Sequence, residues 1–522
     1  MDDFNLLDQP WVEVRLSSGE AVKLGLLDVF RRQHEIAALA YSRPPAMAAV
    51  IRILLAVTHR ALSGSQLRWT VRDRFNWHRN GLPVDAMTAY LEQWRSRFNL
   101  FDPDVPFMQV SALSLADETR DKLKPWTQID LAGASGNAPI VFDHACDLTP
   151  TAIAPADAVN LLLEYQAFVP GGLVKVFRSS DKAGPLANTA AVIPVGSMLW
   201  QTLCLSLHAP AVGAETNDLP CWERPAPTIE DLSASPALAT GSNDRYTHVS
   251  RSVLLLRDPD GCVRWLRFGA GLALDEDIQA PDPMAAYRCG TQGLVRLTFT
   301  EGRALWRDLA ALLPAAGAEG GKAPSVLEYA AALHAEAPIG SSYQHVWVAG
   351  LASDQAKLLR WRLEHIVLPE KLLLNAADVQ DFLDFVRVAD AVYGALRSVA
   401  LRLIGDAMPE RDPREGRTAV RQRFDSGQYA ADFFSRSERA LPEVLRLLQE
   451  GELGQAREHW CHALQGAGRR MWDILQKGQG LRPIALREQA RWAPYFFGAI
   501  NQHLRDFLPG SLELDHEELT HE

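Results

Sequence analysis

The strongest constraint on the fold of this chain is a long amphipathic stripe in its last third. From Val379 to Leu403 apolar residues recur every three or four positions, which is the period of an α-helix with one buried face. Asn375 is suited to cap the first turn of this helix, with Asp378 as an acidic residue three positions later. A helix of about 40 Å cannot bury such a stripe by itself, so it must pack against other helices.

Three further amphipathic stretches follow with short connections, at residues 428–449, 453–477 and 483–508. Four such helices predict an antiparallel bundle, because each stripe must be buried against its neighbours. The expected fold class is therefore α+β. A large, irregular, mixed α/β domain is predicted for residues 1–372, and a C-terminal four-helix bundle for residues 373–522.

The first two thirds of the chain show hairpin signals and long loops. Residues 11–24 alternate around Ser18-Gly19, and residues 252–268 around an Asp-Pro-Asp-Gly turn, so both are predicted β-hairpins. Loops at 102–150 and 166–190 are longer than compact domains usually hold without a function. We therefore expect binding residues in these two loops.

The composition is that of a soluble globular protein, with 47% hydrophobic and 22% charged residues in 522. The N-terminus lacks a secretory signal, and the most apolar run, residues 46–62, is interrupted by Arg52, His59 and Arg60. A cytoplasmic location is expected. The six cysteines are widely spaced without a CxxC pair, which predicts reduced thiols and no structural zinc site.

The formal net charge of −11 argues against a protein that binds DNA alone by neutralising phosphates. Any contact with DNA is expected to be local and to be shared with cationic surfaces of partner subunits.

Motifs that could carry enzyme chemistry are incomplete. Residues 317–323 have the wrong spacing for a phosphate loop, and Ala323 replaces the hydroxyl residue that would hold magnesium. Residues 133–137 do not form a nucleophile elbow, because Asn137 stands where the second glycine belongs. No catalytic residue and no cofactor are predicted.

Two other groups of residues are assigned structural roles. His459 and His462 can share a helix face, but no carboxylate or cysteine is placed to complete a metal site with them. Asp102-Pro103-Asp104 is interpreted as a turn rather than as a carboxylate pair. No metal site is predicted.

Short patterns along the whole length resemble the CasA family, the large subunit of the type I-E CRISPR Cascade complex. They are residues 5–15 (NLLDQPWVEVR), 106–109 (PFMQ), 131–136 (LAGASG), 220–225 (PCWERP) and 282–288 (DPMAAYR). The resemblance implies recognition of a protospacer-adjacent motif in double-stranded DNA, the start of strand separation and a docking surface for a helicase-nuclease. It also implies crRNA-loaded Cascade subunits as partners. As in another RNA-guided effector class, the target sequence would then be recognised by base pairing with the guide RNA.

The family's glutamine wedge corresponds to Gln355, between Asp354 and Ala356. A flexible amide can occupy the place of a base and bond to exposed base edges, which offsets part of the few kcal/mol lost per unstacked step.

The family's glycine loop, which approaches the minor groove through its backbone, corresponds to Val169-Pro170-Gly171-Gly172 with Lys175 after it. Glycine has no Cβ to block close approach, and the degenerate pattern of the minor groove suits a reader that tolerates several motifs. Val169 and Pro170 are departures from the family's glycines.

The family's first long loop, which contacts the guide and neighbouring subunits, corresponds to residues 131–146. Its aromatic is Phe142, its polar residue two positions on is His144, and Asn137 belongs to the same contact loop. An exposed aromatic in such a loop suits an anchor that is buried on assembly; packing of Phe142 back into the core is the alternative.

A hairpin lysine of the family is expected between Gly269 and Leu272 but is missing, and Arg267 is the nearest substitute. A group of arginines in the bundle region is a candidate for phosphates of the displaced strand. These are Arg411, Arg414, Arg417, Arg421 and Arg423. A solvated helix face is the alternative for the arginines; a stand-alone hydrolase or a purely structural scaffold is the alternative for the whole chain.

Overall fold

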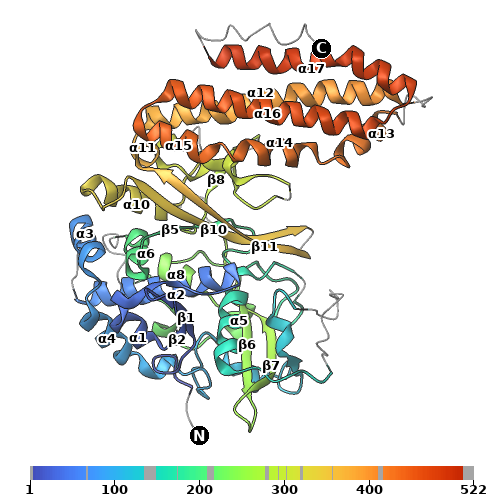
Figure 1. The fold of residues 1–522 in the computed structure, drawn as a ribbon. Helices are drawn as coiled ribbons and strands as arrows, with labels where there is room; N and C mark the ends of the chain where they lie inside the picture. The colour runs from blue at the N-terminus through green and yellow to red at the C-terminus, as the bar shows by residue number, and fades with distance from the viewer. Residues whose placement is uncertain are drawn as a thin grey trace. The chain divides into compact units, whose positions relative to one another are not determined.

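The computed structural model divides into two compact units, shown in Figure 1. Unit 1 comprises residues 1–300 and 317–367, and unit 2 comprises residues 301–316 and 368–522. Residues 301–316 of unit 2 come from within the stretch expected to form the first domain. The residues that the structure describes are 4–65, 69–133, 148–172, 174–208, 217–276, 281–291, 293–300, 302–317, 321–354, 357–408 and 416–508.

The strands are β1 (Val12–Leu16), β2 (Ala21–Leu24), β3 (Ile36–Leu39), β4 (Lys124–Pro125), β5 (Ala191–Val195), β6 (Arg251–Arg257), β7 (Val263–Ala270), β8 (Tyr287–Gly290), β9 (Gly293–Arg296), β10 (Tyr343–Asp354) and β11 (Lys357–Pro369). The α-helices of unit 1 are α1 (Leu26–Arg31), α2 (Pro44–Ser65), α3 (Val71–Asn80), α4 (Val84–Gln93), α5 (Pro155–Phe168), α6 (Leu199–Ser206), α7 (Ile229–Ser233), α8 (Ser242–Tyr246) and α10 (Ser325–Glu336). Its 3-10 helices are η1 (Gln33–Glu35), η2 (Arg95–Phe98), η3 (Ser111–Ser114), η4 (Trp126–Ile129) and η5 (Cys221–Glu223).

Unit 1 is built on small antiparallel sheets. Their strand orders are β2-β1-β3, β4-β7-β6 and β11-β10-β5, and β8 pairs with β9. Both predicted hairpins are confirmed: Val14 pairs with Val22 and Leu255 with Leu266. The turns need glycine because Gly19 and Gly261 have φ values of 92° and 84°, a region that disfavours other residues.

Helix α2 is the core of unit 1 and packs against α4, α5 and α8. Among the described helices it alone is long and apolar enough to cross a membrane, yet 89% of its most apolar window is buried inside the protein. Its Arg52 lies 2.8 Å from Asp282, and both side chains are completely buried. The two charges compensate one another in the interior, where an unpaired charge would be costly.

The short motifs of the sequence have core positions. Trp222 is buried and packs against Phe98 and Phe107, with ring centroids 5.1 and 6.0 Å away. The adjacent Glu223 accepts hydrogen bonds from Arg60 Nε (2.7 Å) and Tyr90 Oη (2.6 Å). Motif 220–225 therefore stabilises the fold of unit 1.

Unit 2 is helical. It contains η6 (Leu305–Leu312), η7 (Pro314–Ala316), α11 (Glu370–Leu374), α12 (Ala376–Ala407), α13 (Gly416–Asp425), α14 (Tyr429–Glu438), α15 (Leu441–Glu450), α16 (Leu453–Gln479) and α17 (Pro483–Phe507). Helix α12 packs against α16 and α17, and α16 also packs against α14 and α15. The predicted fold class, a mixed α/β body followed by a C-terminal helical region, is confirmed.

The expected cap of α12 is confirmed, because the Asn375 side chain accepts a hydrogen bond from the N–H of Ala377 at 2.9 Å. The details of unit 2 differ from the expectation in two other places. The stretch 428–449, expected to be one helix, is divided into α14 and α15, since Pro442 lacks the amide hydrogen that a continuous helix needs. Helix α13 was not expected at all.

Candidate nucleic-acid interface

The predicted glycine loop, Val169 to Gly172 with Lys175 after it, belongs to a longer loop (residues 169–182) that follows helix α5 and whose two ends are joined by backbone hydrogen bonds. The N–H of Gly172 donates to the carbonyl of Asp181 at 3.2 Å, and the N–H of Asp181 donates to the carbonyl of Gly172 at 2.8 Å. At its base the N–H of Gly184 donates to the carbonyl of Val169 at 2.8 Å. These backbone hydrogen bonds join the two ends of the loop and form its stem, residues 169–172 and 181–184.

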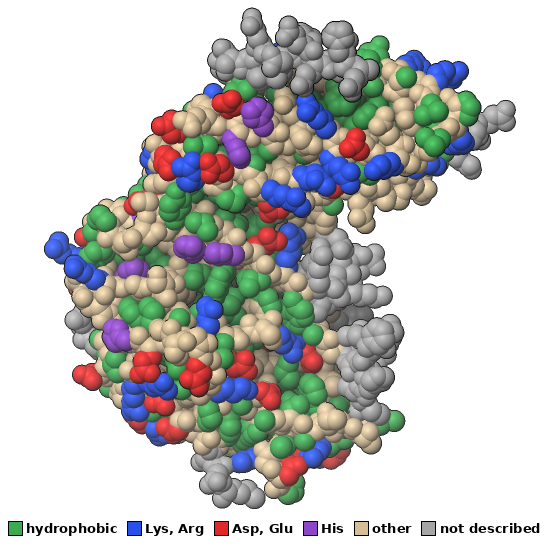
Figure 2. All heavy atoms as spheres, viewed as in Figure 1, with side chains coloured by type: hydrophobic (Ala, Val, Ile, Leu, Met, Phe, Trp, Pro, Cys, Tyr) green, Lys and Arg blue, Asp and Glu red, His purple; other side chains and the backbone are tan. Residues whose placement is uncertain are grey.

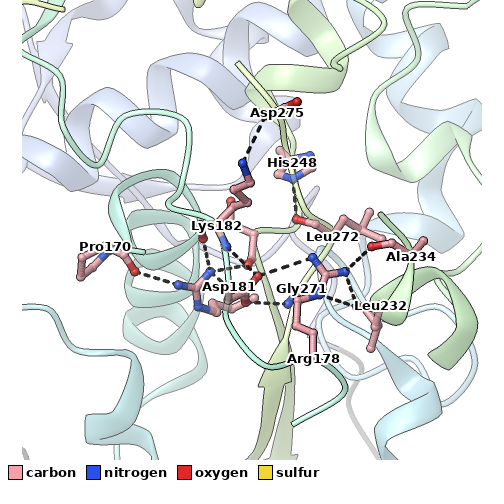
Figure 3. Close-up of polar contacts among 12 residues, drawn as sticks. Pro170, Arg178, Asp181, Lys182, Leu232, Ala234, His248, Gly271, Leu272 and Asp275 are labelled. Carbon is pink, nitrogen blue, oxygen red and sulfur yellow. Dashed lines mark hydrogen bonds and ion pairs between the residues drawn. The ribbon is translucent and has the colours of Figure 1, made fainter. Parts of the chain in front are cut away.

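A buried ion pair anchors this stem to the sheet (Figure 3). Asp181 and Arg251, the first residue of β6, lie 3.1 Å apart with side chains 0% and 1% exposed. Arg251 also donates to the carbonyls of Pro170 and Lys182, each at 2.7 Å, and Asp181 accepts from the N–H of Gly271 at 3.1 Å. Burial raises the pKa of Asp181 and lowers the pKa of Arg251, because each loses hydration as a charge.

The far part of the loop is held as well. Arg178 donates from Nε to the carbonyl of Leu232 at 2.9 Å and from Nη2 to that of Ala234 at 3.0 Å, as Figure 3 shows. Phe177 has a φ of 73°, which is strained for a non-glycine residue, and packs against the cluster of Val110, Leu113, Leu232 and Val249. These contacts fix the loop before any ligand binds.

The exposed part of the glycine loop carries little side-chain bulk. Val169 is buried and Pro170 half-buried, whereas Gly171, Gly172 and Lys175 are exposed. A Cβ at Gly172 would meet no described atom within 4 Å, so the protein itself does not require glycine there. Lys175 has no polar partner among the described residues.

The structure gives a physical reason for the missing hairpin lysine. A Cβ at Gly269 would come within 2.8 Å of the Phe177 ring, and one at Gly271 would overlap the backbone of Ser250. Ala270 is fully buried. Side chains longer than these do not fit. The suggested substitute, Arg267, donates to the carbonyl of Arg120 at 3.0 Å.

In the sequence, the predicted wedge falls between strands β10 and β11. Strand β10 ends at Asp354 and β11 begins at Lys357, and the two strands are neighbours in the sheet β11-β10-β5. Gln355 and Ala356 lie outside the described residues, and of Asp354 only the backbone is described. The wedge therefore stays a prediction.

One residue, Arg43, contacts a residue near each of the three predicted recognition segments. Its Nη2 lies 2.5 Å from Asp130 and 3.0 Å from Glu164, and its guanidinium lies 4.9 Å from the ring centroid of Trp361. Asp130 directly precedes the 131–146 loop, Glu164 is on α5 before the glycine loop, and Trp361 is on β11. Arg43 thus links residues that lie close in sequence to each of the three segments.

Burial raises the pKa of Glu164 to about 8, opposed by the Arg43 charge and reinforced by Asp130. Two carboxylates share one guanidinium in this cluster, so the more buried carboxyl, Glu164, holds a proton more tightly than usual. Asp130 also accepts the N–H of Ala132 at 3.0 Å. The contact-loop residues Asn137, Phe142 and His144 lie outside the described residues.

The predicted arginine cluster falls partly on helix α13. Arg411 and Arg414 lie outside the described residues, whereas Arg417, Arg421 and Arg423 are exposed. Arg417 and Arg421 border a cleft of about 420 Å³, which Arg402 and Trp492 also line. Figure 2 shows Lys and Arg side chains in a row on the viewed face of unit 2.

The residues set aside as non-catalytic have structural surroundings where they are described. Asp102 accepts hydrogen bonds from the N–H groups of Asp104 (3.0 Å) and Val105 (2.8 Å), which confirms the turn. His459 and His462 are exposed on α16. Over the described ranges no three His, Cys, Asp or Glu side chains are grouped to hold a metal ion.

Sequence reasoning missed Arg43, Asp130, Glu164, Asp181 and Arg251. A signal existed for Glu164, which interrupts the run LLLEYQAF, every residue of which is buried. A charged residue within such a run predicts a buried partner, but the partner cannot be chosen from the sequence.

The chain was compared with known proteins. A family model described as CRISPR-associated protein Cse1 matches residues 5–471. The CRISPR-associated protein CasA/Cse1 of Thermus thermophilus is 33% identical over 523 residues, covering 97% of this chain and 99% of that protein.

Solved structures agree with this match. A crystal structure of Thermus thermophilus CasA superposes with a TM-score of 0.82 at 30% identity and covers 96% of this chain and 100% of that one. A chain of a CRISPR RNA-guided surveillance complex superposes with a TM-score of 0.71 at 23% identity, covering 95% and 100%, which shows a common fold.

Fold and site together define an α+β protein with a helical C-terminal unit and an anchored, backbone-rich loop. The chain belongs to the Cse1 (CasA) family of CRISPR-associated proteins.

Proposed function

We propose that this chain is the large subunit of a type I-E crRNA-guided antiviral complex in the cytoplasm. It recognises the protospacer-adjacent motif in double-stranded DNA, starts strand separation and provides a docking surface for the helicase-nuclease, which is recruited after R-loop formation. It works with crRNA-loaded Cascade subunits and performs no chemistry itself. The observation that carries this proposal is the family match over residues 5–471.

The glycine loop supports the role in motif recognition. A reader of the minor groove needs a backbone that approaches closely and keeps its shape. Gly171 and Gly172 are exposed, and the buried pair of Asp181 and Arg251 holds the stem behind them. The loop therefore loses little conformational entropy on binding, and Lys175 adds a cation for a nearby phosphate.

Gln355 acts in this proposal as the wedge, with Asp354 and Ala356 beside it. Asn137, Phe142 and His144 form the loop that contacts the guide and neighbouring subunits. The arginine cluster contacts phosphates of the displaced strand; the exposure of Arg417 and Arg421 beside a cleft with Trp492 supports this role, since aromatic rings stack on unpaired bases.

The decisive experiment adds a side chain at Gly172 in the reconstituted complex. In Gly172→Asp the protein has room for the new carboxylate, but the carboxylate would collide with bound DNA and repel its phosphates. We therefore expect at least a tenfold loss of affinity in gel shifts with a motif-bearing duplex. Gly454→Asp is the matched control, because Gly454 is also exposed with open space around a Cβ. Equal affinity of the two variants would remove the glycine loop from the interface.

A second variant tests the wedge separately. Gln355→Ala should lower the yield of R-loops, measured by permanganate reactivity of unpaired thymines; unchanged affinity and yield would eliminate the wedge.

Crosslinking of the assembled complex to target duplex distinguishes a DNA reader from a purely structural scaffold. Hydrolytic activity of the isolated subunit would favour the hydrolase alternative.

A further inference from the structure

Two histidines on neighbouring strands of unit 1 contact one another at the surface. His345 on β10 and His365 on β11 are both exposed, and Nδ1 of His345 lies 3.0 Å from Nε2 of His365. The ring planes differ by 14° and the centroids are 5.1 Å apart. Figure 2 shows two histidine side chains touching on the viewed face. At this separation one ring nitrogen donates a hydrogen bond to the other.

The backbone beneath this pair is held firmly. Strand β10 is the central strand of its sheet, and His345 pairs with Val195 of β5. The next side chain, Gln344, is buried and donates to the carbonyl of Val195 at 3.1 Å. Ligands on rigid strands lose little entropy when they bind an ion.

The spacing of the two nitrogens suits a shared metal ion. Imidazole nitrogens bind zinc at about 2.0–2.1 Å, so two neighbouring ligands of one ion lie roughly 2.9–3.4 Å apart. We propose that His345 and His365 form a cross-strand site for a divalent transition metal ion, with water in the remaining positions. When the ion binds, the ring that donates this hydrogen bond gives up the shared proton to solvent and takes one on its other nitrogen, so both facing nitrogens have free lone pairs. A rotation of each exposed ring directs these lone pairs at the ion.

The surroundings agree with an open site. A cleft of about 400 Å³ adjoins the pair and is also lined by His78, Gln201 and Tyr343, which leaves room for water ligands. With two protein ligands the site exchanges its ion freely, unlike a closed structural site.

The proposal does not depend on DNA recognition. A bound ion would join β10 to β11 across the sheet, on the strands that lead to Asp354 and Lys357. Metal binding by His345 and His365 is therefore independent of DNA recognition by the glycine loop and the wedge, and it can be tested without DNA.

The test uses the untagged full-length chain, stripped of metal with a chelator and titrated calorimetrically with Ni²⁺. We expect one ion to bind at this site. His345→Gln and His365→Gln should each weaken binding at least tenfold, because a single imidazole cannot chelate. Both residues are exposed, so the variants should fold like the wild-type chain. Equal affinity of these variants and the wild-type chain would overturn the proposal.

The double variant His459→Gln/His462→Gln is the matched control, since it removes another exposed pair of histidines, and it should bind like the wild-type chain. Electron paramagnetic resonance with Cu²⁺ tests the wild-type chain without any substitution: hyperfine splitting from two nitrogens is expected. A spectrum without coupled nitrogens, or loss of the signal in the control variant alone, would also contradict the site.

Discussion

At the scale of single residues, this protein uses buried and half-buried arginines and carboxyl groups to join segments that are distant in sequence. Arg43 joins Asp130, Glu164 and Trp361, and Arg251 joins the two ends of the glycine loop. Buried ion pairs are weak contributors to stability compared with apolar packing, but removing one partner is costly. Their effect here is positional, because each fixes the base of a predicted recognition segment.

The Glu164 cluster predicts a pH dependence of stability. The pKa of Glu164 is about 8 in the folded protein and ordinary in the unfolded chain, so between about pH 4.5 and 8 only the unfolded chain releases the proton. Folding stability from this group therefore falls as pH rises through that window, by on the order of 5 kcal/mol.

Glu164→Gln removes the titration, so the variant should gain stability relative to the wild-type chain from pH 5 to pH 8. Urea denaturation at several pH values measures this difference. If the stability of Glu164→Gln relative to the wild-type chain stays constant or decreases as pH rises, Glu164 is not protonated in the folded protein.

At the scale of elements, the glycine loop is a rigid excursion from the sheet β4-β7-β6. Its stem is closed by backbone hydrogen bonds, and its far part rests on Gly269 of β7 through Phe177. Loops usually gain such order only on binding. Here the anchoring side chains stabilise one conformation in the free chain.

Asp181→Asn should therefore destabilise unit 1 strongly. It leaves Arg251 buried without a counter-charge, which costs about 3–5 kcal/mol. The exposed pair of Lys182 and Asp275, 3.2 Å apart and about half exposed, offers the control, since Asp275→Asn should change stability far less than Asp181→Asn.

Urea denaturation compares the two variants, and hydrogen exchange of the Gly172 and Gly271 amides reports the loop directly. Exchange as slow in Asp181→Asn as in the wild-type chain would show that the ion pair does not hold the loop.

At the scale of the whole molecule, a net charge of −11 coexists with local cationic surfaces. Helix α13 carries Arg417, Arg421 and Arg423 in ten residues, all three exposed. Such a surface can bind phosphates although the chain as a whole repels DNA, and the partner subunits supply further charge.

The salt dependence of DNA binding tests this surface in the assembled complex. When Arg417, Arg421 and Arg423 are replaced by glutamine, the slope of log affinity against log salt concentration should become less negative by up to about 2. Each phosphate contact on a single strand contributes roughly 0.7 to this slope. Arg446→Gln is the control, because Arg446 is exposed but paired with Glu443. An unchanged slope in the triple variant would leave the cluster as a solvated helix face.

Local patterns predicted much of the fold and little of the site. The stripe after Asn375 and the turns at Gly19 and Gly261 need only the sequence, because helix period and turn geometry are local properties. The break at Pro442 and helix α13 were missed, since short helices depend on packing more than on propensity. Gly171 and Gly172 were found through a family resemblance rather than from any local pattern.

By itself, the sequence determined the class of fold, the family and the glycines available for close approach, because periodicity and short motifs are written along the chain. Only the tertiary structure decided that Arg43 joins three segments, that Asp181 and Arg251 form a buried pair and that His345 meets His365. Each of these pairs residues far apart in sequence or on different strands, and which charges and rings meet depends on the packing of the whole unit.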